Sequence, residues 1–425
     1  VGVIWMTTAL ASNDTRPMNA SERARLCRCV PGDQCWPGVK SWKGLQNKIL
    51  GRLTPFDLPS EQGIPISGYI LEAQTTKDIA TTLKFARNHK LKLTNSNQSG
   101  LSDGLVIDTK KLRNITTEPA FTPKGCLSSD YRVPAVTIGA GTSWAEAFND
   151  VATKQHRYIQ GAGFSATSTI DSYTQSGGLG GFAKKFGTSA ANVLQVEVVT
   201  ANGDIVIAND CENTDLFWAI RGGGPRTFGI VTNMTFATHP LPATAGVFQA
   251  TVTAKTDAAY QILLEQYLVF FRQYLNNDHW GDKFTFNKGN QINIALLFQD
   301  LDEQELTKTW QPFQEWIAKN ANVYSMQSEV VNIPADKLWN KAFIEKKFPQ
   351  VAATKESTVF FQSWWLPLNL FEDEHVKSLA NMIFKASRVS DVSFQIDKGL
   401  AGAAIEAMQR TSNTAMNPNV LQAAA

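Results

Sequence analysis

Short apolar runs and stretches of helical spacing follow one another along the first part of the chain. Ile79, Leu83 and Ala86 recur at the three-to-four-residue spacing of an amphipathic helix. By such patterns we expect strands at Ile66–Glu72, Leu91–Thr94, Leu105–Asp108 and Val136–Gly139, and helices at Trp42–Leu50, Thr76–His89 and Ser143–Thr153. The order of these elements predicts a beginning built from βαβ units.

After Pro240-Leu241-Pro242 the pattern changes to strands interspersed with longer helices. The expected strands are Val247–Thr253, Phe284–Phe286, Gln291–Phe298, Phe360–Leu366 and Val392–Gln395, and the expected helices are Asp257–Leu275, Glu303–Ala318 and Glu372–Phe384. An antiparallel sheet with helices on one side fits this order. We therefore expect two domains, residues 1–242 and residues 243–425.

Glycine clusters mark the stretch from residue 171 to residue 235. Gly177, Gly178, Gly180 and Gly181 precede two β-rich runs, Leu194–Thr200 and Ile205–Ala208, which a turn at residues 201–204 joins into an expected hairpin. A short helix (Asp215–Ile220), a second cluster (Gly222–Gly224) and a strand (Phe228–Thr235) follow. Glycine takes positive φ cheaply and lets main-chain N–H groups approach a phosphate, so a nucleotide cofactor is indicated. No strand–GxGxxG–helix fingerprint is present, which argues against an NAD-dependent dehydrogenase.

The same stretch resembles the FAD-binding domain of the berberine-bridge-enzyme-like flavin oxidases, within the vanillyl-alcohol-oxidase superfamily. Segments 27–37, 66–93, 136–151 and 398–421 extend the resemblance in order along the chain. It implies an α+β fold: a PCMH-type FAD-binding domain of two α/β lobes, plus a substrate domain with an antiparallel sheet covered by helices.

The resemblance also implies which residues contact FAD. They are Asn95, Ser96, Asn97, Gln98 and Ser99 in the phosphate loop, then Gly161, Gly163, Ser165, Gln175, Ser176, Gly177, Gly178 and Gly180, and the backbone of Gly229, Ile230 and Val231. Relatives often bond the flavin covalently through a His, where this chain has Gln98, and through a Cys, which aligns near Ser165. Neither residue can make that bond, so we expect noncovalent FAD.

The chemistry implied by the resemblance is removal of a hydride from an alcohol carbon, most often of a sugar or oligosaccharide, with oxygen as the electron acceptor. Candidate residues near the substrate are Tyr173, Gln362, Trp364 and Lys398, and none is assigned as the base. An alternative is a non-catalytic secreted structural or binding protein that retains the fold. The changes at Gln98 and Ser165 support it, as does the lack of the family's Asn-Tyr pair before the sequence stops at Ala425.

The N-glycosylation motifs and the cysteines indicate the cellular compartment in which the protein is expected. Asn-x-Ser/Thr patterns occur at Asn13, Asn19, Asn97, Asn114 and Asn233. We expect glycans at these positions except Asn97, which lies inside the phosphate loop. Cys27, Cys29 and Cys35 lie close together, with Cys126 and Cys211 far off, so up to two disulfides and one leftover thiol are expected without a fixed pairing. These features predict a secreted protein.

Charge and histidine placement exclude several other classes. The net charge of +2 over 425 residues gives no reason to expect nucleic acid or a membrane surface as a partner. The five His are dispersed without metal-ligand spacing, so no metal is expected. Eleven Trp and 24 Phe supply aromatic surface for a core or a sugar site.

Overall fold

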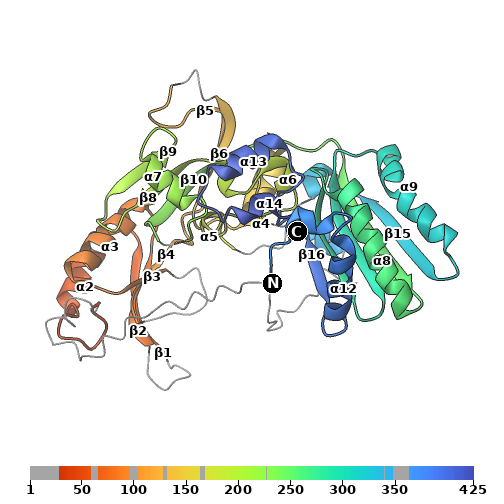
Figure 1. Ribbon diagram of the computed structural model, residues 1–425. Helices are drawn as coiled ribbons and strands as arrows, with labels where there is room; N and C mark the ends of the chain where they lie inside the picture. Colours follow the sequence, from red (N-terminus) through yellow and green to blue (C-terminus); the bar gives the residue numbers. More distant parts are fainter. Residues whose placement is uncertain are drawn as a thin grey trace.

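A computed structural model describes residues 28–58, 66–95, 103–127, 132–162, 168–225, 227–338, 340–347 and 363–425. The molecule is elongated and carries three larger sheets in a row (Figure 1). A four-stranded sheet lies at one end, a five-stranded sheet in the middle, and a second five-stranded sheet at the other end.

The four-stranded sheet has the order β1-β2-β4-β3, with β2, β3 and β4 parallel and β1 antiparallel to β2. Its elements are β1 (Arg52–Leu58), β2 (Ile66–Glu72), β3 (Leu93–Asn95), β4 (Gly104–Asp108), α2 (Val39–Gln46) and α3 (Thr76–Asn88). A capping box between Thr75 and Asp78 starts α3, and its apolar side packs Ile79 and Leu83 into the core of this lobe. The predicted strand at 66–72 and helix at 76–89 are confirmed.

The middle sheet is antiparallel, in the order β5-β6-β10-β8-β9. Its strands are β5 (Ile115–Phe121), β6 (Val133–Gly139), β8 (Val193–Val199), β9 (Ile205–Asn209) and β10 (Ile230–Ala237). The helical segments of this lobe are α4 (Trp144–Phe148), a π-helical turn (Asn149–Lys154), α5 (Ile170–Gln175), α6 (Ala183–Phe186), a 3-10 turn (Ala190–Asn192) and α7 (Thr214–Ile220). The predicted hairpin is confirmed as β8–β9, with Gly203 at a φ of 77° in its turn. A two-stranded pair, β7 (Arg157–Tyr158) with β11 (His239–Pro240), lies beside the lobe.

The third sheet is antiparallel, in the order β15-β12-β14-β13-β16. Its strands are β12 (Ala245–Ala254), β13 (Trp280–Asn287), β14 (Gln291–Gln299), β15 (Tyr324–Asn332) and β16 (Val392–Gln395). Helices α8 (Asp257–Phe270), α9 (Glu303–Lys319) and α12 (Val376–Ser387) bury their apolar sides against one face of it, as predicted. Shorter segments are a π-helical turn (Phe271–Leu275), α10 (Lys341–Lys347) and 3-10 turns at Ala335–Lys337 and Leu368–Phe371.

Two details differ from the sequence prediction for this region. Strand β15 was not expected, because most of its side chains are exposed and carry no apolar alternation. The strand predicted at Phe360–Leu366 is wrong for residues 363–366, which form no strand, and its first residues lie outside the described part.

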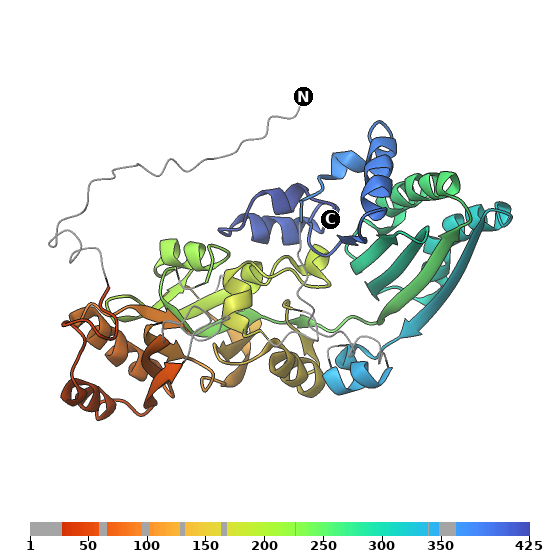
Figure 2. The same cartoon turned by 90° about the horizontal axis from the view of Figure 1, so that it is seen from below.

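The end of the described chain returns to the middle lobe. Helices α13 (Ile405–Ser412) and α14 (Asn419–Gln422) lie beside α6 (Figure 2), where Ala183, Leu400 and Val420 share a small apolar cluster. The boundary near Pro242 therefore stays a proposal, because residues of both predicted domains pack together here.

Two disulfides link described cysteines, Cys29 to Cys35 and Cys126 to Cys211. This agrees with the expected number of bridges, and Cys27 lies outside the described residues. Among the described residues, no helix is both long and apolar enough to cross a membrane. Cys29, Asp33 and Cys35 form the one group there with metal-ligand spacing, and its two sulfurs are bonded to each other.

Candidate functional site

The main-chain carbonyl groups of residues 177–180 are all used by the protein. These residues belong to the segment 177–181, here called the glycine loop. Its carbonyls accept hydrogen bonds from Ala190 N at 2.9 Å, Ser189 N at 2.7 Å, the Tyr173 hydroxyl together with Lys398 Nζ, and Ala183 N at 2.9 Å. Leu179 O receives two of these bonds, the one from Lys398 at 2.7 Å. The carbonyl side of the loop is therefore fixed.

The N–H groups of the glycine loop behave differently. Within the part of the chain that the structure describes, the N–H groups of residues 178–181 find no acceptor. Gly178 and Gly180 are buried, and buried N–H groups are rarely left unpaired in folded proteins. A row of free main-chain donors is suited to an anionic or carbonyl-bearing ligand such as a phosphate or a flavin ring. The loop thus fits the cofactor that the sequence predicts.

The loop needs glycine because the protein's own atoms close beneath it. A Cβ on Gly180 would lie 1.9 Å from the Gly161 carbonyl oxygen. A Cβ on Gly178, where φ is +69°, would lie 2.7 Å from the Tyr173 ring. Any larger residue here would push the loop away from its support.

The second glycine cluster, Gly222–Gly224, has no free donors. Gly222 N donates to Ile220 O at 3.0 Å, Gly223 N to Ala219 O at 3.1 Å, and Gly224 N to Gln175 O at 2.9 Å. This cluster is a satisfied turn, and its last bond ties it to the end of α5. It therefore positions the glycine loop and offers no N–H to a ligand.

Two buried side-chain donors lie close to the loop. Trp144 Nε1 and Gln160 Nε2 have no hydrogen-bond partner among the described residues. Gln160 Nε2 would lie 3.2 Å from a Cβ on Gly180, and the Trp144 ring packs directly on Gly161. Burying such groups unpaired is costly, so they are candidate donors to a bound ligand.

The glycine loop also contacts strands β13 and β14 of the third sheet. A Cβ on Gly281 at the start of β13 would lie 1.7 Å from the Gly181 carbonyl oxygen, and a Cβ on Gly181 would lie 2.8 Å from Leu297 in β14. The glycine loop therefore rests directly on this sheet.

Several ionisable groups meet at this contact. Lys398 pairs with Asp397 at 3.1 Å. Burial raises the pKa of Asp397, with Lys398 acting in the opposite direction. Burial and the nearby Asp397 raise the pKa of Asp282 to about 6. Asp282 also has a positive φ of 69°, which is strained for a residue with a side chain. A strained carboxylate with a perturbed pKa is typical of a catalytic position.

Lys184 in α6 is also buried and lies close enough to Asp397 to interact with it electrostatically. Its ammonium group donates to Asn276 Oδ1, to Ala401 O at 2.8 Å and to Ala424 O at 3.4 Å. Burial lowers its pKa to about 7, and Asp397 acts in the opposite direction. Lys184 thus joins α6 to the third sheet region and to the returning end of the chain.

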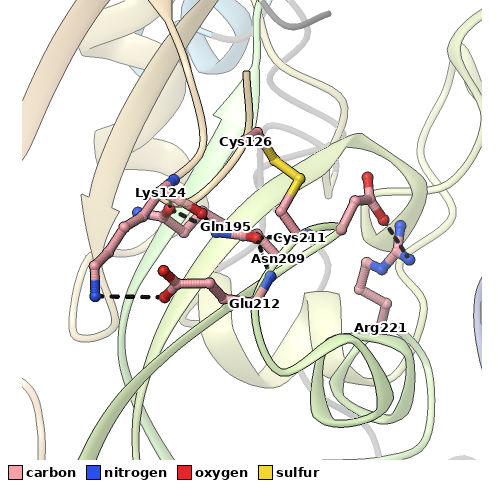
Figure 3. The surroundings of a disulfide bond; sticks show 8 residues. Lys124, Cys126, Gln195, Asn209, Cys211, Glu212 and Arg221 are labelled. Carbon is pink, nitrogen blue, oxygen red and sulfur yellow. Dashed lines mark hydrogen bonds and ion pairs between the residues drawn. A yellow bond between two sulfur atoms is a disulfide. The ribbon is translucent and has the colours of Figure 1, made fainter. Parts of the chain in front are cut away.

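A disulfide and an ion pair hold the turn that precedes the second glycine cluster. Figure 3 shows Cys126 bonded to Cys211, with Lys124 and Glu212 paired beside them at 3.4 Å. Arg221, which ends α7, lies 3.7 Å from Asp210 and stacks its guanidinium on the Phe217 ring at 3.9 Å. These contacts fix the backbone that leads into Gly222.

Among the described residues, no strand pairs with the first residues of β10 on its β6 side. Ile230 and Val231 pair with β8, whereas the pairing with β6 begins at Asn233. Gly229 just before them has a φ of +141° and packs on Val198. This edge is compatible with the expected contact to the adenine end of FAD, which stays a prediction.

The structure brings only part of the predicted site residues together. Gly161, Tyr173, Gln175, Ser176, Gly177, Gly178, Gly180 and Lys398 lie in or against the glycine loop. Gly229, Ile230 and Val231 lie at the start of β10, and Asn95 ends β3. Ser96, Asn97, Gln98, Ser99, Gly163, Ser165 and Gln362 lie outside the described residues.

The candidate Trp364 and its neighbour Trp365 differ in burial. Trp364 is 71% exposed, whereas Trp365 packs near Leu179 in the small apolar cluster. No strand forms at residues 363–366, and the position of Trp364 near the substrate stays a prediction. Sequence reasoning also missed Gln160, Lys184, Asp282 and Asp397, although Asp397 directly precedes the candidate Lys398.

Residues 68–209 match the protein family described as FAD binding domain. The FAD-linked oxidoreductase malF of Malbranchea aurantiaca is 29% identical over 373 residues, 67% of this chain and 62% of that protein. The FAD-linked oxidoreductase easE of Trichophyton verrucosum is 30% identical over 408 residues, 78% of this chain and 66% of that protein. The FAD-linked oxidoreductase penH of Penicillium thymicola is 39% identical over 286 residues, 51% of this chain and 49% of that protein. The chain thus spans about half to two thirds of the length of these relatives.

Solved structures share the fold. A VAO-type flavoprotein from Myceliophthora thermophila matches with a TM-score of 0.74 and 20% identity, covering 94% of this chain and 82% of that one. The xylooligosaccharide oxidase of the same organism, solved with xylobiose, matches with a TM-score of 0.60 and 16% identity, covering 86% and 77%. Berberine bridge enzyme matches with a TM-score of 0.53 and 18% identity, covering 69% and 61%. The fold implied by the sequence resemblance is confirmed.

Proposed function

We propose, on the premise that residues 68–209 belong to the FAD binding domain family, that this chain is an FAD-dependent oxidoreductase acting on an alcohol carbon. The observation that carries the proposal is the row of free N–H donors at residues 178–181, which faces no acceptor among the described residues. FAD would be held noncovalently, since Gln98 and Ser165 cannot bond to the flavin.

FAD, when bound, supplies the hydride acceptor and passes the electrons on, in our proposal to oxygen. The chain's own residues would bind it through the glycine loop, the phosphate loop that starts at Asn95, and the edge of β10 at residues 229–231. Tyr173 and Lys398 hold the loop in place from its carbonyl side through Leu179 O. The cofactor would therefore meet a donor row that is already set.

Asp282 is our candidate for the proton acceptor. It lies beside Gly281, where the third sheet touches the glycine loop, and a pKa of about 6 leaves it mostly ionised near neutral pH. A general base works best when its pKa lies near the working pH. Asp282 would take the hydroxyl proton of the substrate as the carbon loses its hydride.

A carbohydrate is the substrate class we propose. Support comes from the sugar oxidases among proteins of the same fold, one of them solved with xylobiose. The exposed indole of Trp364 offers a stacking surface for a sugar ring. The small-molecule substrate and oxygen would be the reaction partners.

We also propose that the protein is secreted, since its two disulfides are typical of an oxidising compartment. Of the described sequons, Asn114 is exposed and is the better glycan position. Asn233 lies in the central strand β10, and its amide nitrogen donates to Glu197 at 2.9 Å. Asn13 and Asn19 lie outside the described residues.

An absorption spectrum of the purified protein tests the cofactor. We expect the flavin band near about 450 nm, and acid precipitation should release the colour into solution. Colourless protein that also fails to take up added FAD would contradict the proposal and favour a binding or structural protein. Colour retained in the pellet would contradict noncovalent attachment.

Asp282→Asn tests the base with little disturbance of the backbone, because Asn tolerates positive φ. We expect the turnover rate to fall by about 100-fold or more, with flavin content unchanged. In the unchanged protein the rate should rise as the pH passes about 6, because the base must be ionised; the variant should lose this rise. Asp391→Asn, at an exposed position, is the control. Equal rates for the two variants would remove Asp282 from the reaction.

A further inference from the structure

The Met416 side chain lies between the two glycine clusters. A Cβ on Gly177 would lie 2.5 Å from the Met416 methyl carbon, and a Cβ on Gly222 would lie 2.6 Å from Met416 Cγ. Both glycines also have positive φ, 101° and 108°. One methionine therefore fills the space that two missing Cβ atoms leave, and it touches the clusters from both sides.

The backbone beside Met416 is fixed to the end of α7. Ala415 N donates to Arg221 O at 2.9 Å. Arg221 is buried and is itself held by Asp210 and the Phe217 ring. Met416 thus enters the gap from a backbone position next to a fixed residue.

A main-chain bond from Gly224 N to Gln175 O at 2.9 Å joins the second cluster to the end of α5. This bond does not reach residues 177–181, so it does not by itself set the distance between the two clusters. The Met416 side chain supplies a second contact at Gly177, the first residue of the glycine loop. A flexible, unbranched thioether can fill such an irregular gap.

We propose that Met416 is a positioning residue that sets the spacing of the two glycine clusters and so holds the N–H groups of residues 178–181 in the geometry that receives the cofactor. The proposal rests on the proposed function for the identity of that cofactor. The spacing itself is a property of the protein without it.

Three variants test the proposal. Met416→Ala empties the gap, Met416→Leu nearly keeps its volume, and Met382→Ala truncates a methionine that is 56% exposed on α12. Protein freed of flavin is titrated with FAD and the dissociation constants are compared. We expect binding about tenfold weaker for Met416→Ala, within about twofold of the original for Met416→Leu, and unchanged for Met382→Ala. Met416→Ala binding FAD as tightly as the original protein would overturn the proposal.

A second measurement does not depend on FAD. Amide hydrogen exchange is followed at residues 176–181 and 222–225 in flavin-free protein. Met416→Ala should exchange faster at both clusters and Met416→Leu should not. If the original protein binds no FAD, the proposed function fails. The hydrogen-exchange result alone then decides whether Met416 sets the spacing of the two glycine clusters. Unchanged exchange at either cluster would overturn this role.

The thermal unfolding temperature of each variant is measured to detect a general loss of structure. If Met416→Ala does not fold, Met416→Val replaces it as a smaller truncation, with the same expected direction and the same controls. Recovery of FAD affinity by Met416→Leu at an unchanged unfolding temperature is the signature of positioning, because a merely structural role would move affinity and unfolding together.

Discussion

The antiparallel sheet of residues 245–395 and the glycine loop are stabilised by different interactions. Aromatic and aliphatic side chains from the sheet and from α8, α9 and α12 form one continuous apolar core. Around the glycine loop, the contacts are mainly main-chain hydrogen bonds, and several polar side chains are buried there, such as Gln160, Thr174 and Lys184. The first region is stabilised by its apolar core, whereas the second keeps N–H donors that have no acceptor among the described residues, as expected for a region that binds a ligand.

The strongest test of this difference is a truncation in the apolar core. Phe284 is fully buried and contacts the rings of Tyr267, Phe271 and Phe394. Phe284→Ala should lower the free energy of unfolding by about 3 to 5 kcal/mol, measured in denaturant. Ile262→Ala, at an exposed position of α8, should change it by less than about 0.5 kcal/mol. Similar losses for both variants would show that the core is not the source of stability.

A smaller effect on stability, but a larger one on the cofactor, is expected where the two regions touch. Gly281→Ala would place a Cβ 1.7 Å from the Gly181 carbonyl oxygen, so the glycine loop must move off the sheet. We expect a loss of about 1 to 3 kcal/mol and a clear drop in bound flavin, read from the absorption spectrum. Gly289→Ala in the same hairpin meets only ordinary contacts and should keep both quantities. Full flavin content in Gly281→Ala would contradict the contact.

The last test concerns the pH dependence of stability and not its value at one pH. The pKa of Lys184 is about 7 in the folded protein and 10.5 as the ordinary value, so between these values the unfolded chain binds more protons. Stability from this group therefore rises with pH over that window. Lys184→Met should remove the rise in the free energy of unfolding between pH 7 and 10. This holds whether the variant is more or less stable than the original protein at any single pH. Lys40→Met, at an exposed position of α2, should leave the slope unchanged.

Local patterns in the sequence predicted elements whose structure depends on nearby residues. The helix at 76–88 carries its own capping box, and β8–β9 carries its own turn, so both could be expected from a few neighbouring residues. Strand β15 could not, because it is an edge strand with mostly exposed side chains. Its place depends on pairing with β12, which no local pattern encodes.

The site could be predicted only where one segment supplies it. Glycine-rich spacing indicated the loop at 177–181, but not that its N–H side is free while the N–H groups of Gly222–Gly224 are satisfied. The bond from Lys398 to Leu179 O spans 219 positions, and the contact of Gly281 with Gly181 joins two regions with different patterns. Such contacts follow from packing of the whole chain.

The return of the last segment to the middle lobe has a consequence for biosynthesis. Met416 and the Lys184 partners Ala401 and Ala424 are made long after the glycine loop has left the ribosome. During translation the glycine loop therefore has its contacts with Tyr173, Ser189 and Ala190 early, but it gains those with Lys398 and Met416 only after more than two hundred further residues. We therefore expect a nascent chain stalled before residue 400 to retain flavin less well than one that includes Met416.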